Sequence, residues 1–262
     1  MAAESVLLPV DWRAPPGVRV AVTVRAGGVS EGPYASFNLG DHVGDDPAAV
    51  ARNRALLVDA LELPCAPQWL QQVHGTGVVE ARADGVVREA DAAWTDRSGM
   101  ACAVLTADCL PVVIASADGR EVAAAHCGWR GLAAGVLAQT VARFSADASS
   151  LRVWLGPAIG PSAFEVGEDV REAFLAVQPA SRRENIDAAF VPLAGMKGKF
   201  LADLYALARI FLSALGVEDV AGGGRCTFRE SDLFFSYRRD GVTGRMATLA
   251  WIDPAQGIPS ST

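Results

Sequence analysis

A cysteine and a histidine lie on two segments that are predicted to pair. Cys109 directly precedes the apolar segment 110–116, which is typical of a strand buried on both faces. His126 ends the segment 121–126, and the Asp-Gly pair between the two segments predicts a tight hairpin turn. A thiol and an imidazole brought together in this way could bind one metal ion, or act as a nucleophile and its base.

The register of this hairpin places both side chains on one face of the sheet. If the Asp-Gly pair forms the turn, Pro111 pairs with His126. Cys109 lies two residues before Pro111, and side chains on one face recur at every second residue. The thiol and the imidazole are then diagonal neighbours, with backbones roughly 7–8 Å apart, and Cys127 points to the opposite face.

A second histidine completes a possible set of three ligands. His74 follows a predicted strand over residues 67–73 and begins a glycine turn, a usual place for a functional side chain. Two imidazoles and one thiolate would leave one position of a zinc ion open, as in catalytic zinc sites. A structural role stays open at this point, because an isolated cysteine on an apolar strand is most often a small core residue.

The composition indicates a folded, acidic protein. Of the 262 residues 51% are hydrophobic and 20% are charged, and the net charge is −7. This charge argues against binding of nucleic acid and against a basic membrane-surface patch. The sequence contains no apolar stretch near the ~20 residues needed to cross a bilayer, and its start lacks the basic segment of a signal peptide. We therefore expect a cytoplasmic protein.

The five cysteines suggest no disulfide framework. Their number is odd, they are widely spaced, and no two form a Cys-x-x-Cys pair, so a structural zinc knuckle is not indicated either.

Periodicity and turn residues predict both strands and helices, and the sequence shows no internal repeat and no linker. We expect strands at 18–24, 67–73, 90–95, 100–106, 110–116, 121–126 and 151–155, with a closing pair at 226–237 and 245–252. Helices are expected from Pro47, behind an Asp46 cap, to about Leu61, and at 132–144, 167–177 and 200–215. Residues 179–198 are predicted to be irregular.

Several ordered motifs resemble the YfiH/laccase-domain family. They are TVRAGGVS and YASFNLGDHVGDDPAAVARNR, QQVHGTGV, TADCLPVV, AAHCGWRGLAAGV, GPAIGPSAFEVG, and CTFRESDLFFSYRRDGVTGRMATLAWI. The resemblance spans about residues 18–252. It implies one α/β domain, residues 1–262, built as a layered sandwich with a mixed β-sheet core flanked by helices and related in architecture to bacterial toxin deamidases.

The resemblance also implies an activity and a metal. Family members bind one zinc ion through residues that match His74, Cys109 and His126. Their ascribed activity is phosphorolysis of adenosine, inosine, guanosine and methylthioadenosine, alongside adenosine deamination. The implied partners are purine nucleosides and phosphate, for a monomer or small homo-oligomer.

An older description of the family as multicopper polyphenol oxidases conflicts with the residue content. Copper sites of that kind are built largely from imidazole, and the chain has three histidines in total. A single copper ion in the same three-ligand site stays possible.

Phosphorolysis would need cationic groups for phosphate and polar groups for the nucleoside. Arg130, at the start of a helix, and Arg25, in a glycine turn, are the candidates for phosphate, and we place both in the catalytic set with Cys109 and His126. Asn38 and His42 are candidates for contacts with the base or ribose. The proton-transferring acid is not identified, and Asp108 and Glu165 are only possible choices.

Two other functions fit the same residues. Cys109 and His126 could form a thiol hydrolase or deamidase, in which the thiolate is the nucleophile. A non-catalytic nucleoside-binding module would use the same loops without turnover. The His-x-Glu and Pro-Cys-x-x-Cys motifs of ordinary nucleobase deaminases are absent from the sequence.

Overall fold

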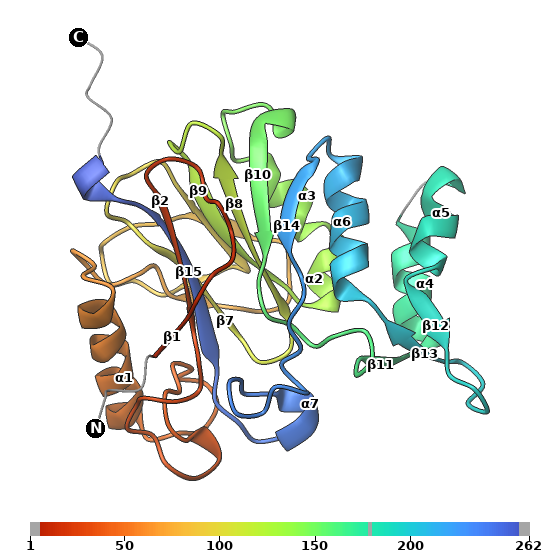
Figure 1. The fold of residues 1–262 in the computed structure, drawn as a ribbon, viewed down its shortest axis with the longest axis horizontal. Helices are drawn as coiled ribbons and strands as arrows, with labels where there is room; N and C mark the ends of the chain where they lie inside the picture. The colour runs from red at the N-terminus through yellow and green to blue at the C-terminus, as the bar shows by residue number, and fades with distance from the viewer. Residues whose placement is uncertain (1–5, 178–179, 257–262) are drawn as a thin grey trace.

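Two β-sheets packed face to face form the centre of the molecule (Figure 1). The computed structural model describes residues 6–177 and 180–256. The first sheet has the order β1 (Leu7–Leu8), β2 (Val18–Thr23), β15 (Met246–Ile252) and β7 (Cys102–Thr106). The second has the order β14 (Asp219–Gly222), β10 (Leu151–Leu155), β8 (Leu110–Ser116), β9 (Val122–Cys127), β6 (Ala92–Thr95) and β4 (Val78–Glu80).

Strand pairing makes the second sheet mixed. β10 with β14 and β4 with β6 run parallel, whereas the β8–β9, β8–β10 and β6–β9 pairs are antiparallel. Side chains alternate between the faces of each strand, so each sheet contributes one apolar face to the space between the sheets. Val113 and Trp154 of the second sheet pack there with Val22 and Ala250 of the first.

Helices cover both outer faces, which completes the layered α/β sandwich that the family resemblance implies. Helix α1 (Pro47–Ala60) lies on the first sheet, and Leu57 packs there with Leu249. On the second sheet lie α2 (Trp129–Ala134), α3 (Val136–Val141) and α6 (Leu204–Ala214). Beyond them, α4 (Glu168–Ala176) and α5 (Ala180–Asp187) stand beside α6 at one side of the molecule (Figure 1).

The remaining elements are short. A three-stranded sheet consists of β11 (Glu165–Gly167), β13 (Lys199–Ala202) and β12 (Phe190–Pro192), and a two-stranded one of β3 (Leu70–Gln71) and β5 (Arg88–Glu89). Short helices are η1 (Gly32–Tyr34), η2 (Ala148–Ser150), α7 (Tyr237–Asp240) and η3 (Pro254–Gln256). Within the described residues, no helix combines the length and the apolar character that a membrane span requires.

The central hairpin follows its predicted register. Pro111 of β8 pairs with His126 of β9, and Cys127 packs on the helix-covered side of the sheet. Helix α1 also begins as predicted, because the Asp46 side chain accepts a hydrogen bond from the backbone N–H of Ala48.

Several boundaries differ from the predictions. The expected helix 132–144 starts at Trp129, ends at Val141 and is interrupted at Gly135, whose φ of +99° lies in the left-handed region that glycine tolerates. The expected strand 67–73 shrinks to the two residues of β3.

Three further segments differ in type. Within the expected irregular segment 179–198, α5 and β12 form, while residue 179 lies outside the described residues. The start of the expected helix 200–215 belongs to β13. Residues 227–236 form turns and irregular backbone, Cys226 forms only an isolated bridge with Ala158, and Tyr237 begins α7. The predicted closing pair is therefore wrong, and β15 pairs with β2 and β7.

Candidate metal centre

Three side chains from separate segments converge at one end of the second sheet. His126 lies near the end of β9, Cys109 directly precedes β8, and His74 lies in the loop after β3. One ligand atom of each residue lies within 4.8 Å of the other two. The Cys109 Sγ atom is 3.9 Å from His74 Nε2, and the two imidazole rings meet edge to face with centroids 4.8 Å apart. The structure thus brings the three predicted ligands together.

Asp91, immediately before β6, connects two of these segments. Its carboxylate is fully buried and accepts a 2.8 Å hydrogen bond from Nδ1 of His126. The same carboxylate accepts hydrogen bonds from the backbone N–H groups of Val73, His74 and Gly75. One side chain therefore fixes both the ring of His126 and the backbone that carries His74.

Two residues of the site have backbone angles that side chains rarely adopt. His74 has a φ of +60° and Asp108, next to Cys109, a φ of +93°. Such conformations cost on the order of 1–3 kcal/mol and persist where surrounding contacts impose them. The hydrogen bonds to Asp91 hold the backbone of His74 in its conformation. That of Asp108 is held by Thr227 Oγ1 and the backbone N–H of Arg238, which both donate to the Asp108 carboxylate.

The pKa values of Cys109 and His126 are shifted in opposite directions even without a metal. Burial by itself would raise the pKa of the Cys109 thiol, but the neighbouring imidazoles, His126 first, outweigh burial and lower this pKa to about 6. Burial would lower the pKa of His126, and the Cys109 thiolate together with the Asp91 carboxylate raises it to about 9. The metal-free site is therefore a thiolate beside an imidazolium.

The geometry fits a zinc ion. Tetrahedral zinc with Zn–N near 2.0–2.1 Å and Zn–S near 2.3 Å places its donor atoms roughly 3.4–3.6 Å apart. The atoms Sγ of Cys109 and Nε2 of His74 are 3.9 Å apart, and all three ligand atoms lie within 4.8 Å of one another, so binding would draw them together slightly. A ligand histidine whose other nitrogen donates to a carboxylate is the usual outer-shell arrangement, and His126 with Asp91 has this form. Binding would require the thiolate that the site already favours.

The segment after His126 closes the site at very short range. Gly128 is buried, and a Cβ atom at this position would lie 2.8 Å from Cδ2 of His74 and 3.1 Å from Sγ of Cys109. A Cβ atom at Gly131 would lie 2.8 Å from the carbonyl oxygen of Gly75. Both glycines let helix α2 pack directly on the ligand loops.

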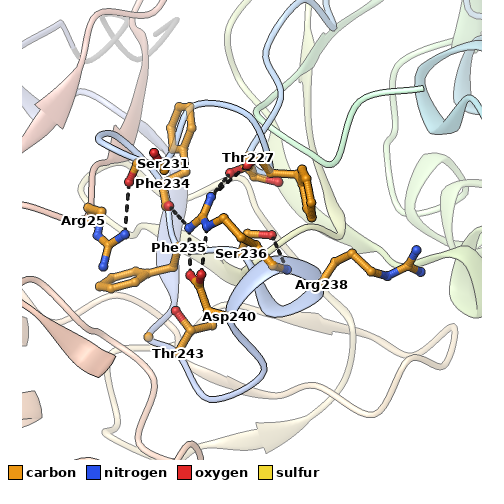
Figure 2. A network of polar contacts seen from close by, with 12 residues as sticks. Arg25, Thr227, Ser231, Phe234, Phe235, Ser236, Arg238, Asp240 and Thr243 are labelled. Carbon is orange, nitrogen blue, oxygen red and sulfur yellow. Dashed lines mark hydrogen bonds and ion pairs between the residues drawn. The ribbon is translucent and has the colours of Figure 1, made fainter. Parts of the chain in front are cut away.

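The loop that supports Asp108 is itself held by one arginine. The guanidinium group of Arg239 donates to the carbonyl oxygens of Thr227 and Phe234 and to the carboxylate of Asp240. Figure 2 labels these three acceptors. Ser236, at the start of α7, accepts a hydrogen bond from the backbone N–H of Arg239. This network fixes residues 227–240, which carry the two donors to Asp108.

The two arginines predicted to bind phosphate lie in different surroundings. Arg25 donates to the carbonyl oxygens of Ala35 and Ser231 and lies over the ring of Phe235 (Figure 2). Arg130 is exposed, and its guanidinium group stacks on Trp129. In the described part of the chain, no hydrogen bond or ion pair joins either arginine to the three ligands. Their assignment stays a prediction.

Asn38 and His42 lie near an arginine that the sequence did not single out. The Oδ1 atom of fully buried Asn38 accepts hydrogen bonds from the backbone N–H groups of Gly40 and Arg245. His42 is exposed and lies 3.5 Å from Asp41, and the charge of Arg245, after desolvation, lowers its pKa. Arg245 directly precedes the last strand, β15, and its position in the sequence gives no signal of function.

The two acids considered for proton transfer have structural partners. The Asp108 carboxylate is largely buried and binds Thr227 and the backbone of Arg238, as described above. Glu165 lies at the surface, 3.4 Å from Lys199. The carboxylate that does contact the site, Asp91, was not predicted. Its one sequence signal is an acidic residue directly before an apolar strand.

The fold and the site define an α/β sandwich with one three-ligand centre between a β-hairpin and a histidine loop. The chain belongs to the multi-copper polyphenol oxidoreductase laccase family, whose sequence model matches residues 19–253. Its single cluster of three or more possible ligands in the described residues, and its three histidines in total, do not supply the several sites of a multicopper oxidase.

Similar proteins cover nearly the whole chain. A purine nucleoside phosphorylase of Pseudomonas aeruginosa is 54% identical over 245 residues, which are 94% of this chain and 98% of that protein. Purine nucleoside phosphorylase YfiH of Escherichia coli is 49% identical over 95% of this chain and 99% of that protein. A solved DUF152 protein of Neisseria meningitidis is 50% identical, with a TM-score of 0.89 over 95% of this chain and all of that structure.

Gly128→Ala should weaken the metal site without unfolding the protein. The added methyl group would collide with His74 and Cys109, while the backbone angles of Gly128 suit alanine. We expect zinc affinity, measured by competition with a chelator, to fall at least ten-fold. Gly224→Ala is the matched control, because a Cβ atom there has open space. Equal zinc affinity in both variants would contradict the close packing described here.

Proposed function

We propose that the protein is a zinc-dependent purine nucleoside phosphorylase. The observation that carries the proposal is the site of His74, Cys109 and His126 with Asp91 behind it, in a chain whose relatives are named purine nucleoside phosphorylases. Purine nucleosides and phosphate are then the substrates. The ascribed range of adenosine, inosine, guanosine and methylthioadenosine, and a second activity as adenosine deaminase, are part of the same proposal.

The proposed reaction exchanges one bond at the ribose. A phosphate oxygen bonds to C1′ while the bond from C1′ to the purine nitrogen breaks. The purine leaves with the electron pair and takes up the proton that hydrogen phosphate loses when it becomes the ester. When bound, zinc would supply a Lewis acid beside the substrate. Asp91 would hold His126 in one tautomer and orientation, and the exposed side of His74 would leave the centre open to a ligand from solvent.

Phosphate dependence tests this proposal directly. Zinc-quantified protein is incubated with adenosine or inosine, with and without phosphate, and the products are separated. We expect free base and ribose 1-phosphate only with phosphate, and loss of both zinc and activity in Cys109→Ala. The control is Cys65→Ala, at a half-buried cysteine outside the site. Full activity in Cys109→Ala, or turnover that does not need phosphate, would contradict the proposal.

A thiol hydrolase is a second candidate, and two observations favour it. The lowered pKa of Cys109 and the hydrogen bond from His126 to Asp91 have the form of a nucleophile, its base and the carboxylate that orients the base. A zinc-bound thiolate would not be available for this chemistry. The two functions therefore differ in whether Cys109 is free when the protein is active.

Alkylation by iodoacetamide separates the two candidates. In zinc-free protein we expect Cys109 to react as its thiolate, so the rate should rise with pH and reach half its maximum near pH 6. Buried Cys102 and Cys127, whose pKa values burial raises, should stay unmodified. Zinc should protect Cys109, as followed by mass spectrometry of peptides. Rapid alkylation that zinc does not slow, with enzyme activity lost in parallel, would favour the hydrolase.

A further inference from the structure

Arg245 is an unusual cation beside the metal centre. Arg245 is half-buried directly before β15, and its Nη1 atom donates to the carbonyl oxygens of Thr243 and Gly244. In the described residues, no protein acceptor receives a hydrogen bond from its Nε or Nη2, and no carboxylate forms an ion pair with it. A desolvated charge without a counterion is costly, so this arrangement favours an anion from outside.

Strand pairing places Arg245 near Cys109, because Met246 of β15 pairs with Thr106 of β7, three residues before Cys109. Burial lowers the pKa of Arg245, while the charges of Cys109 and Asp108 are the strongest of those that raise it. Both acidic groups have other partners. The Asp108 carboxylate binds Thr227 and the backbone of Arg238, and the Cys109 thiolate would bind the metal. Neither neutralises the guanidinium group by direct contact.

A dedicated set of contacts fixes the stem of Arg245. The Oδ1 atom of buried Asn38 accepts from the backbone N–H of Arg245 at 2.8 Å, and the Nδ2 atom of Asn38 donates to Gly40 and to Asp45. A Cβ atom at Gly40 would lie 2.8 Å from Cγ of Arg245. The stem therefore runs along Gly40 at a distance that only glycine permits, and one orientation of the side chain is selected.

We propose that Arg245 binds the phosphate substrate beside the metal centre. The proposal rests on the phosphorylase function above and assigns one of its substrates to a residue. The Nε and Nη2 groups of Arg245 can donate side by side to two oxygens of one phosphate. Such charge-assisted hydrogen bonds are strong in a partly desolvated site. Asn38 then acts as a positioning residue that holds Arg245, in place of the direct contact with base or ribose that the sequence suggested.

Binding of inorganic phosphate to the zinc-loaded protein tests the assignment without turnover. Isothermal titration should show one phosphate site in the unaltered protein, and at least ten-fold weaker binding in Arg245→Gln. Arg245→Lys keeps the positive charge but loses the two parallel donors of the guanidinium group, so we expect an intermediate affinity for phosphate. Arg209→Gln is the matched control, because this half-buried arginine donates to the carbonyl oxygens of Val220 and Gly222 instead. Its phosphate affinity should be unchanged.

A second variant leaves the arginine in place. Gly40→Ala should displace the stem of Arg245 and weaken phosphate binding, while zinc content stays at one equivalent.

In steady-state kinetics, Arg245→Gln should raise the KM for phosphate much more than the KM for the nucleoside. A general loss of structure would lower zinc content and melting temperature instead, and these are measured for every variant.

The outcomes separate this assignment from the proposed function. Phosphate binding that is lost in Arg245→Gln supports the site even if no nucleoside is cleaved. Phosphate-dependent cleavage with the same phosphate KM in Arg245→Gln overturns the site and leaves the function standing. Absence of phosphate binding to the unaltered, zinc-loaded protein also overturns it.

Discussion

The buried carboxylate of Asp91 is the contact on which the metal centre depends. It accepts hydrogen bonds from the ring of His126 and from three successive backbone N–H groups of the His74 loop. Burial alone would raise the pKa of this carboxyl, but the hydrogen bonds, that from His126 first, outweigh burial and lower it. The charge is therefore stable inside the protein and sets the orientation of two ligands at once.

The sandwich supplies the rigidity that this contact needs. β6, β8 and β9 are neighbours in one sheet, so Asp91, Cys109 and His126 lie together at the same end of these strands. Apolar side chains on both faces of β8 and β9 fix these strands against the first sheet and against helices α2 and α3. Only His74 comes from a loop, and the strained backbone at that residue is held by the sheet through Asp91. Function is thus concentrated where regular structure ends.

Local signals in the sequence were sufficient for part of the site. An Asp-Gly turn between two apolar segments determined the pairing of Pro111 with His126, and with it the side of the sheet on which Cys109 lies. Asp91 and Arg245 were not found, because a strand pattern shows neither which carboxylate is buried nor which arginine lacks a partner. Residues 226–237 were expected to be a strand, yet their backbone follows the contacts of Arg239, which depend on tertiary structure.

X-ray absorption at the zinc edge, on protein as purified, tests the central claim most directly. The account predicts one zinc ion per chain, with two imidazole nitrogens at about 2.0–2.1 Å and one sulfur at about 2.3 Å in its first shell. A first shell without sulfur would remove Cys109 from the centre. Several copper ions per chain in place of zinc would contradict the single-metal site built on Asp91.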